Sequence, residues 1–296
     1  SPLHEVLVCD EPTNCTIASG MHTLVTPDGA SWKAESLEKK YEGHAKVLEE
    51  FVSVEPGKSD PRWYFYLAQS WRDTGTIEGA KKALYWYRKR LEFSGGYWEE
   101  LYYSQYMVAQ LKARLSMHPE TAAEHPPLDV MHEFLACGRY NTARCEHLVP
   151  IIKHYHDRGD FETSLIYSSH AMRTSAGNCQ TPFPQSSLFI DKRTYEYEIL
   201  QLQILNEYHS GRIPQSRETA RKMQRLLAMG KVPPDAVENA KSNIEWYVKH
   251  FDAAKNQYPT AHMGPSVMQD FHRREIERAA AAGATAPVRL TPKTAQ

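Results

Sequence analysis

The sequence lacks a long apolar run and an excess of charge of one sign. No stretch approaches the roughly 20 apolar residues that a membrane-spanning helix needs, so we expect no membrane partner. The formal net charge is −1, so the overall charge does not attract nucleic acid, and we expect no nucleic-acid partner. With 41% hydrophobic and 24% charged residues, the composition is typical of a globular protein.

Cysteine is scarce, and the motifs of common enzymes are absent. The five cysteines stand at positions 9, 15, 137, 145 and 179, an odd number without the spacing of a disulfide framework. We therefore expect reduced thiols and a cytoplasmic protein. No phosphate loop, HExxH, GxSxG or CxxC motif occurs, so we assign no catalytic residue. The chain opens with Ser and without a signal peptide, so we expect a processed chain or a part of a longer one.

Glycine is also sparse, but one glycine follows a clear helical pattern. In "DPRWYFYLAQSWRDTG", Tyr64, Leu67, Ala68 and Trp71 stand at i, i+3, i+4 and i+7 before Gly75. This spacing predicts one face of an α-helix. A glycine just beyond the pattern is typical of a helix C-terminus that needs a left-handed residue.

The same register recurs before and after two further glycines. Before Gly159 the four offsets are all apolar, and before Gly211 half of them are. An apolar residue stands two positions after each of the three glycines: Ile77, Phe161 and Ile213. A small residue stands five positions after each: Ala80, Ser164 and Ser216. A small side chain there lets a second helix approach the first, which predicts a repeating helical hairpin.

We therefore predict an all-α, right-handed solenoid of tetratricopeptide-like helical hairpins over residues 36–255. An extra hairpin is expected between the first two glycines, with helices at 97–116 and about 128–137 and an exposed loop at 117–127. Pro150 predicts a kink or a late helix start. A last helix is expected at 233–251, where Pro and Asp open it.

The two ends of the chain differ from this helical region. "HEVLVC" (4–9) and "MHTLVT" (21–26) are short, apolar and β-branched, which predicts a β-like segment over 1–35. Over 177–187 the sequence predicts a long loop. Residues 256–296 are expected to form a peripheral helix and a mobile tail, because small residues dominate the end.

Several aromatic residues are candidates for a ligand groove along the first helices of the hairpins. Aromatic side chains at helical spacing usually form a core, and we favour that role for Trp71 and Tyr155. The candidates for stacking on a peptide or a sugar are Trp63, Trp98, Tyr103 and Tyr106.

Histidines and cysteines give weaker signals. His147, His154 and His156 are close in sequence, but we favour hydrogen-bonded or solvated roles over a metal site. Cys137 and Cys145 lack the partner pair of a metal site.

Polar residues in the β-like segment give one further candidate. His4, Glu5 and His22 could converge across adjacent strands and hold a divalent cation or a pyrophosphate. We favour ordinary exposed polar residues there.

Four stretches carry a family resemblance. "HEVLVCDEP", "DGASWK", "PRWYFYLAQSWRDTG" and "SLFIDKRTYEYEILQL" resemble, in this order, the C-terminal part of inverting family-two glycosyltransferases with tetratricopeptide-like repeats. The resemblance covers about residues 4 to 250. It implies a preceding nucleotide-sugar-binding α/β domain whose closing edge is residues 1–35. His4 and Glu5 would then lie at the edge of the donor site, and His22 would be the metal candidate.

The resemblance implies a role as well as a fold. The catalytic base and the acidic metal-binding motif of the family have no counterpart here, so Mn²⁺ or Mg²⁺ and a nucleotide sugar are expected only with a catalytic domain. This chain would hold an acceptor protein or glycan, or mediate homo-oligomerisation. One alternative is a stand-alone tetratricopeptide-like scaffold, which would expose Lys, Arg and Asn along its first helices. Another is an enzyme whose site is completed by another chain.

Overall fold

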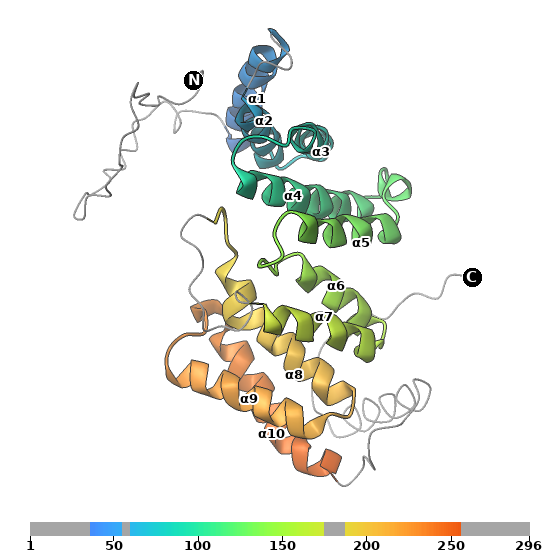
Figure 1. The fold of residues 1–296 in the computed structure, drawn as a ribbon, viewed down its shortest axis with the longest axis vertical. Coiled ribbons are helices and arrows are strands. Elements are labelled where there is room, and N and C mark those ends of the chain that lie inside the picture. The colour runs from blue at the N-terminus through green and yellow to red at the C-terminus, as the bar shows by residue number, and fades with distance from the viewer. Residues whose placement is uncertain (1–35, 55–59, 175–186, 256–296) are drawn as a thin grey trace, which may run out of the picture. The chain divides into compact units, whose positions relative to one another are not determined.

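The computed structural model describes residues 36–54, 60–174 and 187–255. Within these ranges the chain has ten α-helices and no strand, which confirms the all-α part of the predicted fold. Consecutive helices pack as neighbouring pairs (Figure 1). The chain divides into two compact units, Ser1–Glu133 (unit 1) and Phe134–Gln296 (unit 2). The predicted β-like segment 1–35, most of the loop 177–187, and the tail 256–296 lie outside the described residues.

Unit 1 consists of helices that pack in chain order. Their bounds are Leu37–Val54 for α1, Pro61–Asp73 for α2, Ile77–Leu91 for α3, Trp98–Ser116 for α4 and Pro127–Ala136 for α5, which crosses into unit 2. The helix α1 packs on α2, α2 on α3, and α3 on α4. Asp60 begins α2, because its carboxylate accepts a hydrogen bond from the Arg62 N–H at 2.9 Å.

The helices of the extra hairpin occur at the expected positions, as α4 and α5. The loop between them was predicted to be exposed, and this is wrong for two of its residues. Thr121 is 1% exposed and His125 is 9% exposed. The Thr121 hydroxyl donates a hydrogen bond to the Leu115 carbonyl at 2.6 Å, which draws the loop onto the end of α4. Buried polar groups of this kind require such partners.

Unit 2 repeats the sequential packing. Its helices are α6 (Leu148–Asp157), α7 (Phe161–Arg173), α8 (Ile199–His209), α9 (Ile213–Ala228) and α10 (Val237–Lys255), and a π-helical turn at Thr194–Glu198 precedes α8. Each helix packs on the next one in the chain. The helix α6 begins only at Leu148, so Pro150 falls in its first turn, where a missing N–H leaves no intrahelical bond unmade. The predicted late start is confirmed.

The three glycines of the repeat register have the backbone conformation that the register predicts. The φ angle is +74° at Gly75, +76° at Gly159 and +71° at Gly211, and each residue lies between two consecutive helices. A side chain with a Cβ adopts this left-handed conformation only at a cost. Gly230 has the same conformation, with a φ of +64°, between α9 and α10. Gly96, between α3 and α4, has a φ of +85°. The sequence pattern did not reveal these two positions.

The small residues of the register lie where the two helices of each hairpin meet. Ala80, Ser164 and Ser216 are all 0% exposed. Both serine hydroxyls donate a hydrogen bond across the hairpin, from Ser164 to the Ile152 carbonyl at 2.8 Å and from Ser216 to the Ile204 carbonyl at 2.9 Å. In each case the acceptor is twelve residues earlier in the chain. The two hairpins of unit 2 therefore share one geometry.

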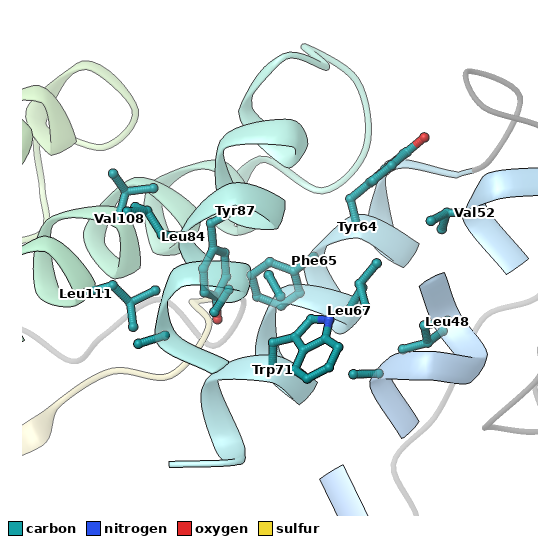
Figure 2. Packing of buried hydrophobic residues seen from close by; sticks show 14 of the residues in the cluster. Leu48, Val52, Tyr64, Phe65, Leu67, Trp71, Leu84, Tyr87, Val108 and Leu111 are labelled. Atoms are coloured by element: carbon teal, nitrogen blue, oxygen red, sulfur yellow. The ribbon is translucent and has the colours of Figure 1, made fainter. Parts of the chain in front are cut away.

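The core of unit 1 is rich in aromatic rings. Figure 2 shows Phe65, Leu67 and Trp71 of α2 among side chains from α1, α3 and α4. The indole N–H groups of Trp71 and Trp86 both donate to the same carboxylate oxygen of Glu49, at 3.0 and 3.1 Å. This carboxylate therefore ties α1 to α2 and α3. The expected core role of Trp71, which is 4% exposed, is confirmed.

Candidate functional site

A row of aromatic rings runs across three helices of unit 1. Phe51 of α1 contacts Trp63 of α2, with ring centroids 5.5 Å apart, and Trp63 contacts Tyr66 at 6.0 Å. Phe65 follows at 6.1 Å from Tyr66 and then Tyr103 of α4 at 5.9 Å from Phe65. We call these five residues the aromatic row. Only Phe65 is buried, so the other four present part of a ring to the surface.

The helix spacing explains how the row forms. Trp63 and Tyr66 are three residues apart on α2, which places them on neighbouring positions of one helix face. Phe51 is 42% exposed on α1, which packs directly against α2. The ring pairs are tilted or edge-to-face, with interplanar angles between 56° and 74°, as aromatic pairs prefer. The row is therefore a packed surface feature.

Arg72 stands at one end of the aromatic row. Its guanidinium donates a hydrogen bond to the Tyr103 hydroxyl at 2.9 Å and pairs with the Asp73 carboxylate at 2.7 Å. It also reaches the hydroxyl of Tyr87 at 3.5 Å. The side chains of Arg72 and Asp73 remain 25% and 33% exposed. A partly exposed planar cation therefore lies at the hydroxyl end of the half-buried Tyr103, an arrangement suited to a ligand with both apolar and polar groups.

The structure places the four predicted groove residues in two settings. Trp63 and Tyr103 belong to the aromatic row. The Tyr106 ring lies parallel to the buried Tyr102 at 6.3 Å, and the Tyr106 hydroxyl accepts a hydrogen bond from Gln110. Trp98 opens α4 and is 46% exposed. The groove itself stays a prediction.

Sequence reasoning missed three contributors to this surface. Phe51 lies on a helix outside the glycine register, so the repeat search did not reach it. Tyr66 follows Trp63 by three residues, so an analysis of that face of α2 would have found it. Arg72 lies on the opposite side of α2 and reaches the row only through the Tyr103 hydroxyl, a contact that the sequence does not reveal. The earlier candidates His4, Glu5 and His22 lie outside the described residues.

Unit 1 also contains a buried arginine that shapes the connection between α3 and α4. Arg90 is 0% exposed, and its Nε donates to the Glu100 carboxylate at 3.1 Å. Its other N–H groups bond the carbonyls of Phe93 and Gly95 at 3.0 and 3.1 Å. Arg62 binds the second oxygen of Glu100 at 2.9 Å. All these donors are used within the protein, which indicates a structural role.

A second buried cluster lies in unit 2, where Arg144 binds both oxygens of Glu146 and also the Leu188 carbonyl at 2.7 Å. The Tyr195 hydroxyl donates to Glu146 and accepts from the Cys145 N–H at 2.9 Å. Burial alone would raise the pKa of Glu146, but the hydrogen bonds from Arg144 and Tyr195 hold it below its usual value. The carboxylate is therefore ionised, and both of its oxygens accept hydrogen bonds.

Cys145 and His147, the residues on either side of Glu146, are both uncharged at neutral pH. Burial raises the pKa of the Cys145 thiol to about 11, so it is not a thiolate at neutral pH. Burial lowers the pKa of His147 to about 4, so this imidazole is neutral. The ring nitrogens of His154 and His156 are hydrogen-bonded, to Arg158 at 2.9 Å and to Asn206 at 2.8 Å. The hydrogen-bonded roles expected for these two histidines are confirmed.

The described residues contain neither a candidate metal site nor a candidate membrane-spanning helix. Over this part of the chain, no group of three or more His, Cys, Asp or Glu residues is placed to hold a metal ion. In the same ranges no helix is long and apolar enough to span a lipid bilayer. Comparisons with protein-family models, curated proteins and solved structures found no match to this chain.

Proposed function

We propose that this chain is a tetratricopeptide-like, right-handed solenoid that holds a partner molecule on the aromatic row of unit 1. The observation that carries the proposal is the chain of ring contacts from Phe51 to Tyr103, in which every ring except the buried Phe65 is partly exposed, with Arg72 at its end. Exposed aromatic residues and arginine are the side chains that contribute most to binding surfaces. Sequential helix pairs with left-handed glycines at their turns support the repeat architecture.

We further propose that the partner is the acceptor, a protein or a glycan, of a glycosyltransferase. Support comes from the sequence resemblance described above and from the surface, because flat ring faces beside hydrogen-bonding groups suit a sugar. In this proposal Mn²⁺ or Mg²⁺ and the nucleotide sugar belong to a catalytic domain, and the helical region holds the acceptor or a second copy of the chain. The enzyme completed by another chain, with His22 as a metal ligand, stays an untested alternative.

The second candidate is a stand-alone scaffold that binds a peptide. Such a scaffold was expected to expose basic residues along its first helices. In unit 1, Arg62 is exposed and Arg72 is half-buried on α2, whereas in unit 2 the basic residues gather on α9, the second helix of its hairpin. This distribution gives the peptide proposal less support at the aromatic row than the glycan proposal has.

Binding to arrayed oligosaccharides and arrayed peptides separates the two candidates. We expect oligosaccharide binding that the double variant Trp63→Ala/Tyr66→Ala reduces about tenfold or more, since it removes two ring faces. Trp98→Ala is the matched control, because it removes an exposed indole outside the row. If the protein binds peptides instead, and the double variant weakens that binding to the same extent, the scaffold proposal replaces the glycan proposal. Equal loss in the control and the double variant would refute the aromatic row as the site.

A further inference from the structure

The helix α9 of unit 2 and the residues that flank it carry an excess of positive charge. From position 212 to 231 the chain carries one acidic residue, Glu218, and six basic residues: Arg212, Arg217, Arg221, Lys222, Arg225 and Lys231. All of the basic residues except Arg217 are exposed. Because the whole chain has a net charge of −1, this excess is local to one face. No residue of the aromatic row takes part in it.

The helix separates its buried residues from its charged residues. Ile213, Ser216, Ala220 and Met223 are buried on the side that packs on the neighbouring helices. Arg217, Arg221 and Arg225 follow one another at intervals of four residues on the other side. Residues four apart lie on the same helix face, about 6 Å apart along the axis. A row of guanidinium groups results.

A carboxylate already lies between two of these arginines. Glu218 faces Arg221 at 3.4 Å and Arg225 at 3.6 Å. The three side chains are between 54% and 59% exposed, so water screens both ion pairs and each is weak. A carboxylate from outside the chain can therefore replace Glu218 at small cost.

We propose that the basic face of α9, formed by Arg217, Arg221, Lys222 and Arg225, binds an acidic peptide segment. Arginine forms paired hydrogen bonds with carboxylates, and the face carries three arginines and one lysine. Arg212, just before α9, already pairs with Glu162 of α7 at 2.8 Å. The 16 residues of α9 span about 24 Å, which is the length of about seven residues of an extended peptide. An acidic stretch of that length could place carboxylates along the whole row.

Nucleic acid is the weaker choice of polyanion for this face. The helix α9 contains no aromatic residue on which an unpaired base could stack. The net charge of −1 also supplies no long-range attraction for a phosphate backbone. The acidic peptide needs only the short-range pairing that Glu218 already demonstrates.

The test measures binding of a fluorescein-labelled deca-glutamate peptide by fluorescence anisotropy at an ionic strength of about 0.15 M, where the Debye length is about 8 Å. We expect Arg221→Glu/Arg225→Glu to weaken binding about tenfold or more, because attraction becomes repulsion. The control Lys241→Glu/Lys249→Glu reverses the same number of charges on exposed residues of α10 in the same unit. It should change the affinity by less than about twofold, since its charges lie off the row.

A second variant should change the affinity for the peptide in the opposite direction. Glu218→Gln removes the competing carboxylate and should tighten binding of the peptide about two- to threefold, consistent with the weak exposed ion pairs. Unchanged binding by the arginine double variant, or an equal loss in the α10 control, would overturn the proposal. Tighter binding of a labelled single-stranded oligonucleotide of ten bases at the same salt concentration would also overturn it, in favour of nucleic acid.

Discussion

The two units build the same helical hairpin with different side chains at its centre. In unit 1 the residue five positions after the turn glycine is Ala80, and rings fill the surrounding core. In unit 2 the equivalent residues are Ser164 and Ser216, whose hydroxyls bond carbonyls of the facing helix. Close approach of two helices therefore requires a small side chain, while its polarity can vary if its hydrogen bond is satisfied.

The first helices of the hairpins show the same contrast. On α2 the inner offsets hold apolar or aromatic residues, but on α8 two of them hold Gln203 and Glu207, which are 7% and 8% exposed. The Gln203 amide donates to Glu207 at 2.7 Å, and the Thr219 hydroxyl donates to the other oxygen at 2.7 Å. At these hairpin positions unit 1 uses apolar packing, whereas unit 2 uses paired polar groups.

The largest expected effect comes from breaking a buried ion pair in unit 2. Arg144→Met should lower the free energy of unfolding by about 3–5 kcal/mol, because it leaves the Glu146 carboxylate buried without its cation. Arg62→Met in unit 1 removes an exposed partner and leaves Glu100 paired with Arg90, so it should cost about 1 kcal/mol or less. Urea unfolding measures both.

Fluorine NMR of protein labelled with 5-fluorotryptophan separates the units in this experiment. Trp246 is the single tryptophan of unit 2, and the other five belong to unit 1. Adding Glu146→Leu to Arg144→Met should restore most of the lost stability, since the uncompensated charge disappears. A double variant as unstable as the single one would show that packing, and not charge, causes the loss.

A smaller effect should appear on acidification. Because the pKa of His147 is lowered to about 4 by burial, the unfolded chain binds a proton at this residue between its usual pKa, about 6.5, and 4, and the folded chain does not. Above about pH 6.5 the neutral imidazole makes its full contribution to stability, and this contribution is lost as the pH falls from 6.5 to 4. Between pH 6.5 and 5 the loss should be about 2 kcal/mol, measured at the Trp246 resonance.

Two variants sharpen this test. His147→Gln should flatten the pH dependence of unit 2 between pH 6.5 and 5. Burial raises the pKa of Glu207, so its contribution has the opposite sign and grows as the pH falls. Glu207→Gln should therefore make the acid-induced loss steeper. A pH profile that neither variant changes would contradict the assignment of these two groups.

The sequence predicted the helices and turns well, because their signals are local. The left-handed conformation of Gly75 and the burial of Ala80 follow from spacing along a single hairpin. The aromatic row could be predicted only in part, since Phe51 reaches Trp63 from a helix outside the register. The clusters around Arg90 and Arg144 escaped detection, because buried arginines and exposed arginines look alike in a sequence.

The smallest expected effect tests the comparison of the units at one structural position. Ser164→Ala and Ser216→Ala should each cost about 1 kcal/mol, because the facing carbonyl loses its donor. Ala80→Ser should change stability by no more than about 0.5 kcal/mol, since the new hydroxyl lies twelve residues after the Ala68 carbonyl, the separation found in both serine hairpins. Thermal unfolding of the three variants measures these changes in stability. A cost of several kcal/mol for Ala80→Ser would mean that unit 1 cannot accept the polar solution used by unit 2.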